Sequence, residues 1–181
     1  MDNVQIANEY VKSIIGKGFF KIGRMSNILC FHFGKETSRH IRNGRLIKRG
    51  EIALHVQTYW RIIDTFAQTI ILSANDFYLP NDEIEKSDEY DSLSFDWDEY
   101  GNNLFDQKAD LLEQTCSGAK VLDCRVKAYM DLDVVFSNGL CLEVISDNTR
   151  DDQEIWRILH LDKDLPHFVA FGNQIVLPDL T

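Results

Sequence analysis

The chain has 181 residues, of which 44% are hydrophobic, and 29 acidic against 19 basic side chains give a formal net charge of −10. That length fits one ordinary domain or two small halves that share a core. The acidic balance excludes nucleic-acid binding through a general electrostatic footprint and favours a basic protein partner. No apolar run is long enough to cross a bilayer and no secretory leader opens the chain, so we expect a cytoplasmic protein without membrane contact.

Cysteine and motif content also restricts the function. The four cysteines are Cys30, Cys116, Cys124 and Cys141. They form no CxxC pair and most lie in apolar runs, so we predict four reduced core cysteines, no metal site and no cofactor. The sequence lacks GxGxxG, P-loop, GxSxG and HExxH motifs. We therefore predict no catalytic residues and a binding protein rather than an enzyme.

Apolar side chains at helical spacing predict the first helix over residues 3–16. Asp2 or Asn3 can cap its start, and Gly16 or Gly18 can end it. The following residues 19–33 predict two strands joined near Met25-Ser26-Asn27. His32 lies inside the second, nearly all-apolar strand, and we expect it to be a satisfied structural histidine rather than a catalytic one.

A basic patch follows, with a hairpin-forming Asn43-Gly44 inside it. Its members are Arg39, Arg42, Arg45, Lys48 and Arg49. One interpretation is an anion or nucleic-acid contact. The other is a solvated hairpin held near acidic residues elsewhere in the chain, and the overall charge favours it.

Residues 50–63 predict one long strand, which can bend at Thr58 or Tyr59. Ile52, Leu54 and Val56 share a face with Trp60, and Arg61 lies on the other face. An arginine beside a core face implies a carboxylate or aromatic partner.

A second tryptophan–arginine pair predicts an internal duplication. Trp60-Arg61-Ile62-Ile63 is matched by Trp156-Arg157-Ile158-Leu159. After each comes a pattern of strand, small polar turn, strand and proline, over residues 69–80 and 167–178, with turns at Asn75-Asp76 and Gly172-Asn173.

The predicted fold is therefore α+β, mainly antiparallel sheet, with one helix followed by strands in each half. We expect a first repeat over 1–80, an acidic aromatic connector over 81–103 and a second repeat over 104–181. The two repeats would pair about a pseudo-two-fold axis as one globular unit, with Trp60 and Trp156 in a common core.

The connector holds nine acidic residues and one lysine, a net charge of −8. Its first half reads as a solvated link, but a disordered linker rarely carries three large aromatics in six residues. We expect the second half to dock, either on the protein's own core or on a basic partner. The candidate partner-binding residues are Asp91, Phe95, Asp96, Trp97, Asp98, Glu99 and Tyr100.

The second half of the chain repeats the pattern. Residues 104–116 predict a helix with a stripe of Phe105, Ala109, Leu112 and Cys116, widened by Leu111. Residues 120–145 predict strands with a hairpin at Ser137-Asn138-Gly139. Three carboxylates on these strands, Asp131, Asp133 and Glu143, could bind a metal or act as acid and base, although alternating acids more often mark a solvent face.

The chain also resembles a group of small uncharacterised bacterial proteins. The resemblance covers most of the chain and depends on Leu54-His55-Val56-Gln57 with Trp60-Arg61, on Phe95-Asp96-Trp97-Asp98 running into Asn103-Leu104-Phe105-Asp106, and on His167-Phe168-Val169. Some such acidic proteins are immunity proteins against secreted toxins, so the resemblance implies that role. It carries over no functional residue.

Three functional hypotheses follow. The first is a binding protein of the immunity type that occludes a basic toxin such as a nuclease. The second is a self-associating module, a homodimer in which the basic patch of one copy meets the acidic segment of another. The third is a small hydrolase using Asp131, Asp133 and Glu143.

Overall fold

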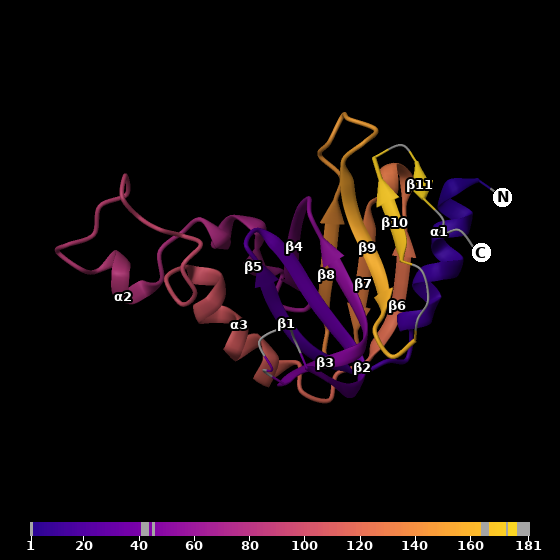
Figure 1. Ribbon diagram of the computed structural model, residues 1–181, viewed down its shortest axis with the longest axis horizontal. Coiled ribbons are helices and arrows are strands. Elements are labelled where there is room, and N and C mark those ends of the chain that lie inside the picture. Colours follow the sequence, from indigo (N-terminus) through magenta and orange to yellow (C-terminus); the bar gives the residue numbers. More distant parts are fainter. Residues whose placement is uncertain (1, 41–43, 45, 164–166, 173, 177–181) are drawn as a thin grey trace.

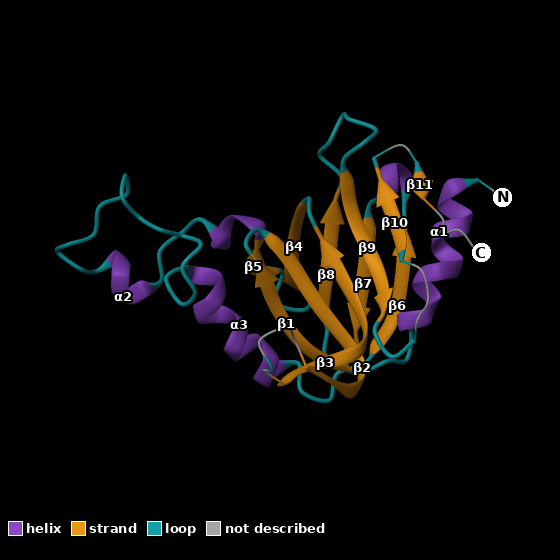
Figure 2. Cartoon of the chain, viewed as in Figure 1, coloured by secondary structure: helices purple, strands orange, loops and turns teal. Residues whose placement is uncertain are grey.

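The computed structural model describes residues 2–40, 44, 46–163, 167–172 and 174–176. The described chain is mainly antiparallel sheet with few helices, the α+β class that the sequence predicts (Figure 2). The helices are α1 (Asn3–Val11), η1 (Lys12–Ile14), η2 (Ala74–Phe77), α2 (Asp82–Glu85), α3 (Leu104–Thr115) and η3 (Ala128–Met130). The strands are β1 (Phe19–Met25), β2 (Ile28–His40), β3 (Leu46–Val56), β4 (Tyr59–Asp64), β5 (Thr69–Ser73), β6 (Val121–Val126), β7 (Leu132–Phe136), β8 (Leu140–Ile145), β9 (Glu154–His160), β10 (Phe168–Phe171) and β11 (Ile175–Val176).

The strands form two sheets with related strand orders. The first sheet runs β1-β2-β3-β9-β10-β11, and the second runs β6-β7-β8-β4-β5. Three consecutive strands from one half of the chain thus lie beside three consecutive strands of the other half in the first sheet, and beside two in the second. Apart from β11, the two orders are the same with the halves exchanged.

The single long strand predicted over residues 50–63 is wrong, because two strands in different sheets share that stretch. β3 ends at Val56 in the first sheet, and β4 begins at Tyr59 in the second. At the crossing, the Gln57 amide donates to the Ile155 carbonyl at 2.8 Å, and the Thr58 hydroxyl donates to the Ile145 carbonyl at 3.0 Å. These local bonds satisfy the backbone where the chain changes sheet.

The side-chain alternation predicted for this stretch survives the crossing. Ile52, Leu54, Val56, Trp60 and Ile62 are all buried. Because both sheets turn one face to a shared interior, the period-2 pattern continues from one sheet into the next.

The strand–turn–strand pattern predicted for residues 69–80 is wrong in its second half. After β5 the chain forms η2 instead of a strand, since the Ser73 and Asp76 side chains form a reciprocal capping box. η2 buries Phe77 against Trp60, with ring centroids 5.5 Å apart. In the other half β10 and β11 do pair antiparallel, while Asn173 of that turn lies outside the described residues.

The two sheets pack face to face around one core. Both Trp60 and Trp156 are fully buried in it, which confirms their predicted common interior. Phe31 and Phe33 of the first sheet stack on Phe136 of the second, with ring centroids 6.1 and 6.4 Å away. Burial of large side chains from both halves makes the chain one packed unit.

The two main helices cover opposite ends of this sandwich (Figure 1). α1 packs beside β6, and its Tyr10 stacks on Phe168 of β10 at 4.6 Å. α3 packs beside β1, and its Phe105 lies 6.0 Å from Trp60. The predicted extent of both helices is close to the observed one, but Leu111 does not widen the apolar stripe of α3, because it is 65% exposed.

The cysteines and the hairpin at residues 137–139 agree with the sequence prediction. All four cysteines are free and buried, as predicted. The hairpin predicted at residues 137–139 joins β7 and β8, with Gly139 at φ +86°. No helix in the described part of the chain is long and apolar enough to cross a membrane.

Candidate functional site: an acidic arm

Residues 81–103, here called the acidic arm, leave the sandwich and return to it at nearly the same point. The Asn81 amide donates to the Asn102 carbonyl and the Leu104 amide donates to the Leu79 carbonyl, both at 2.8 Å. An isolated bridge pairs Pro80 with Asn103. Between these closed ends the arm reaches well beyond α3, at the left of Figure 1. It is an excursion from one end of the fold rather than a link between two separated parts.

A buried ion pair holds the base of the arm. Arg24 of β1 donates from Nε and Nη2 to the two carboxylate oxygens of Asp106 in α3, at 2.9 and 2.8 Å. Their side chains are only 5% and 4% exposed. Hydrogen bonding to Asp106 is the main reason that the pKa of Arg24 is raised above its ordinary value. A bidentate pair of this kind fixes geometry as well as charge.

The same guanidinium extends to the arm. Arg24 Nη1 donates to Asp98 Oδ1 at 3.1 Å, and Nη2 donates to the carbonyls of Asp98 and Glu99 at 3.2 and 3.3 Å. The Gly101 amide donates to Asp106 Oδ2 at 2.8 Å. Together these bonds, here called the Arg24 clamp, join β1, α3 and the returning half of the arm.

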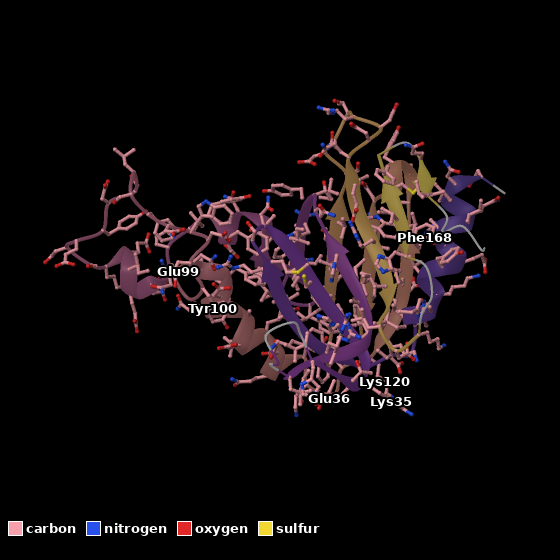
Figure 3. The ribbon with its side chains drawn as sticks, in the orientation of Figure 1. Lys35, Glu36, Glu99, Tyr100, Lys120 and Phe168 are labelled. Atoms are coloured by element: carbon pink, nitrogen blue, oxygen red, sulfur yellow. The ribbon has the colours of Figure 1, made fainter. Side chains whose placement is uncertain are left out.

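The three aromatic residues in the second half of the arm have different surroundings. Trp97 packs edge-on against Tyr78, with ring centroids 4.9 Å apart, and its carbonyl accepts from Asn103 Nδ2 at 2.9 Å. Phe95 packs on Tyr90 within the arm itself, at 5.9 Å. Tyr100 stays 79% exposed. Trp97 therefore packs against a half-exposed side chain of the body rather than inside the core, while Tyr100, labelled in Figure 3, is exposed.

The charges of the arm stay on its surface. The nine acidic residues are Asp82, Glu83, Glu85, Asp88, Glu89, Asp91, Asp96, Asp98 and Glu99, and all nine are exposed. Among the described residues, only Asp98 of these nine forms an ion pair with a basic side chain. Asp91 accepts from the Leu93 amide and from Ser94, which lowers the pKa of its carboxyl. The arm thus presents many carboxylates that the chain itself does not neutralise.

The arm also has an exposed apolar side chain and a cavity at its base. Leu93, near the middle of the arm in sequence, is 95% exposed. Where the arm meets α3, a cavity of about 310 Å³ is lined by Glu83, Tyr100, Asp106 and Asp110, among others. A basic side chain entering it would meet carboxylates and one aromatic face, a combination that attracts cations.

The predicted basic patch is only partly described, since Arg42 and Arg45 lie outside the described residues. Lys48 pairs with Glu36 at 3.0 Å, and Arg49 donates to the Leu161 carbonyl at 2.8 Å. Arg39 lies opposite Ile47 in the β2–β3 ladder. In the part of the chain that the structure describes, no bond joins this hairpin to the acidic arm.

The three carboxylates proposed for a hydrolase each have a separate partner. Asp133 pairs with Lys127 at 2.9 Å, and Glu143 pairs with Arg61 at 2.5 Å, the carboxylate partner predicted for that arginine. Asp131 accepts from the Ser146 amide at 2.8 Å. The described residues include no group of three or more His, Cys, Asp or Glu side chains that could hold a metal ion.

The expectation that His32 is satisfied within the sheet is wrong. Its Nδ1 is buried and has no hydrogen-bond partner among the described residues. The residue opposite it on β3 is Ala53, which has no side-chain acceptor to offer. Burial lowers the pKa of His32 to about 4, so the ring is neutral at neutral pH.

Sequence reasoning found the surface of the arm but missed its anchor. The sequence predicted no role for Arg24 and no anchoring role for Asp106, although Asn103 and Asp106 stand in the N-cap and N3 positions of a capped helix. That spacing places an acid at a helix start, where charge is favourable, but it does not reveal a partner 82 residues away.

Comparison with protein-family models, curated proteins and solved structures finds no match to the chain. Its function therefore has to be inferred from its own residues.

Proposed function

We propose that this protein binds a basic protein partner through its acidic arm. The observation that carries the proposal is the fastening of a strongly charged, exposed segment by a buried ion pair. The arm has a net charge of −8, yet the Arg24 clamp and the Trp97–Tyr78 contact hold it against the body. Like charges held close together repel one another and lower the stability of the fold. A segment that holds them in place despite this cost is better explained by binding to a partner than by a role in folding.

A fixed acidic surface supports both fast and selective association. Complementary charge steers a basic partner towards the arm, and exposed aromatic or aliphatic side chains then anchor the contact. Tyr100 and Leu93 are the anchors we propose, since they are 79% and 95% exposed within the charged segment. Preorganisation lowers the ordering cost of binding.

The proposed partner class is a basic toxin such as a nuclease, which an immunity-type protein would occlude. Carboxylates of the arm would stand in for nucleic-acid phosphates on the basic surface of the partner. The support is the density of exposed carboxylates on the arm, of which only Asp98 is paired with a basic side chain among the described residues.

Co-purification tests this proposal. The tagged full chain would be used to capture partners from its native host at low and at high salt. We expect a basic protein that is retained at low salt and released at high salt, because exposed ion pairs are screened. Absence of any partner at low salt contradicts the proposal.

Charge-neutral variants locate the contact. Asp96→Asn combined with Glu99→Gln removes two arm carboxylates and leaves Asp98 with Arg24. At about 0.2–1 kcal/mol per exposed pair, we expect affinity to fall by roughly 2- to 30-fold. Glu9→Gln with Asp162→Asn, two exposed carboxylates outside the arm, is the matched control. Equal effects in both variants would mean that net charge, and not the arm, governs binding.

We also propose that the two halves derive from one duplicated unit of a helix and five strands. The exchanged strand order supports this, as do Gly16 and Gly118, which follow the two helices at φ +79° and +80°. Gly18 and Lys120, two residues further along, form a bridge with one another. An experimental structure in which α1 with β1–β5 cannot be superposed on α3 with β6–β10 would contradict the duplication.

A further inference from the structure

The outer face of the first sheet carries a line of basic side chains along β2 and β3. Phe31 and Phe33 point into the core, so His32 between them points outwards. Lys21 of β1 lies directly opposite His32 and therefore shares its face. Because α1 and α3 cover the ends of the sandwich, neither of these two helices lies over this face (Figure 1).

Two arginines extend this line along the β2–β3 ladder. Ile52 of β3 points into the core, so by alternation Arg49, three positions before it, points outwards. Arg39 of β2 lies opposite Ile47, which is on the same side of β3 as Arg49. The outward basic side chains, here called the cationic strip, are Lys21, His32, Arg39 and Arg49.

The fold does not neutralise the cationic strip. Burial lowers the pKa of Arg49, and the neighbouring charge of Arg39 lowers it further. Burial likewise lowers the pKa of His32, with further contributions from His55, Lys21 and Arg49. All of these neighbours are bases. Among the described residues, Lys21, Arg39 and Arg49 form no ion pair with a carboxylate.

Two polar atoms of the cationic strip also lack an acceptor. His32 Nδ1, which donates in one tautomer of the neutral ring, and Arg49 Nε are buried without a hydrogen-bond partner in the described part of the chain. The Arg49 guanidinium is held only through Nη2, which donates to the Leu161 carbonyl at 2.8 Å. A buried donor without an acceptor lowers stability. Unpaired positive charge and unpaired donors together favour a carboxylate or another oxyanion as ligand.

The acidic arm has the complementary chemistry. Eight of its nine exposed carboxylates form no ion pair with a basic side chain of the described chain. Within one copy, the arm projects away from the sheets, so it does not cover the cationic strip (Figure 1). The acidic surface that can reach the strip is therefore the arm of another molecule.

We propose that the cationic strip of one copy binds the acidic arm of a second copy of this chain. Each copy has both surfaces, so two copies can bind each other twice about a two-fold axis, as an isologous dimer requires. The arm, residues 81–103, has 23 residues, within the roughly 20–30 residues per side of a standard interface. Exposed ion pairs are individually weak, so the dimer is concentration-dependent.

This contact uses the same arm as the proposed function but does not require the basic partner. A second copy bound to the arm would compete with that partner. Nucleic acid fits the cationic strip less well, because its phosphates would also meet the acidic remainder of a chain with a net charge of −10. The arm instead brings a limited set of carboxylates on one projecting segment.

Sedimentation equilibrium of the full chain at about 50 mM NaCl, where screening is weak, measures the association. We expect a concentration-dependent dimer. Lys21→Glu with Arg39→Glu reverses the strip, and Glu89→Lys with Glu99→Lys reverses two exposed arm carboxylates. Each double variant alone should raise the dimer Kd by at least about ten-fold, because like charges then face each other.

A mixture of the two double variants gives the sharpest measurement. In the mixed dimer the reversed strip faces the reversed arm, and the unaltered arm faces the unaltered strip, so opposite charges meet at both contacts. We expect a Kd within about three-fold of that of the unaltered chain. A mixture that stays monomeric overturns the proposal, as does an unaltered chain that is monomeric at every concentration.

The control is Lys12→Glu with Arg150→Glu, which gives the same change in net charge at side chains that are 57% and 68% exposed outside the strip. Its Kd should stay within about two-fold of the unaltered value. Equal weakening by the control and the strip variant would mean that net charge governs association, and it overturns the proposal. Circular dichroism checks each fold, and Lys21→Gln with Arg39→Gln replaces the strip variant if that protein does not fold.

The strip variant also separates this proposal from the other uses of the two surfaces. Nucleic acid that co-purifies with the unaltered chain, and is lost in the strip variant, would assign the strip to that polyanion and overturn the dimer. Because the strip variant keeps every carboxylate of the arm, it should still bind a basic partner. Loss of the dimer alone therefore leaves the proposed function of the arm intact.

Discussion

The two ends of the sandwich are each covered by a helix but differ in what they expose. At the α1 end, Tyr10 stacks on Phe168, and β11 extends the sheet past β10. At the α3 end, the acidic arm projects from the body and an apolar groove stays open beside β5. The comparison indicates that the α1 end completes the packing of the fold, while the α3 end exposes charged and apolar surface.

The outer faces of the two sheets differ in how their arginines are paired. In the second sheet Arg61 lies opposite Glu143 and pairs with it. At the corresponding place in the first sheet, Arg157 lies opposite His55 and pairs instead with Glu154 of its own strand. The outer face of the second sheet therefore carries an ion pair between neighbouring strands, whereas the outer face of the first sheet carries neutral imidazoles at neutral pH.

The largest expected effect tests whether the α3 end depends on the Arg24 clamp. Arg24→Met leaves Asp106 buried without its cation, which should cost about 3–5 kcal/mol of unfolding free energy. Urea unfolding measures the loss. Arg150→Met removes an ion pair with Asp152 whose side chains are 68% and 67% exposed, and it should leave the unfolding free energy almost unchanged. Similar losses in both variants would show that the clamp is no stronger than a surface pair.

A pH series sharpens the comparison between the sheet faces. Burial lowers the pKa of both His32 and His55 to about 4, with Lys21 and Arg49 acting on the first and Arg157 on the second. The unfolded chain, with an ordinary histidine pKa near 6.5, takes up protons first, so this stability is present above about pH 6.5 and is lost as pH falls towards 4.

The expected loss between pH 7.5 and pH 5 is roughly 1–2 kcal/mol per histidine, discounted because both rings are partly exposed. Urea unfolding of the unaltered chain and of the His32→Gln, His55→Gln variant measures it. The variant should show a shallower decline. Parallel declines in the two proteins would assign the acid sensitivity to other groups.

The smallest expected effect compares the caps of the two helices. Asn103, fully buried, accepts from the Asp106 amide and donates to the Trp97 carbonyl. Asn103→Ala should cost about 2 kcal/mol, and Asp2→Ala at the exposed start of α1 should cost about 0.5–1 kcal/mol. Hydrogen exchange across the arm should accelerate only in the first variant. Unchanged exchange would mean that the cap does not hold the arm.

Local patterns predicted much of this fold. Alternation placed Ile52, Leu54 and Trp60 on a buried face, and helical spacing with caps located both main helices. The errors came where a local bond competes with a periodic pattern, as at Ser73 and Asp76, whose capping box replaces a strand.

The rest depends on distant contacts that one sequence does not reveal. Composition identified the acidic arm, but its anchor joins Arg24 to residues of the arm and of α3 far along the chain. The groove beside β5 was not predicted, because Leu111 read as part of the buried stripe. Its exposure depends on how α3 lies against β5, a tertiary arrangement that the spacing of apolar residues along the helix does not reveal.

The closed base of the arm has an evolutionary consequence. Since Pro80 and Asn103 form a bridge, the segment between them begins and ends at one spot on the scaffold. Its length and sequence can change without shifting any strand register, because loop closure depends only weakly on loop length. The sequence of this segment can therefore diverge while the sandwich behind it stays the same.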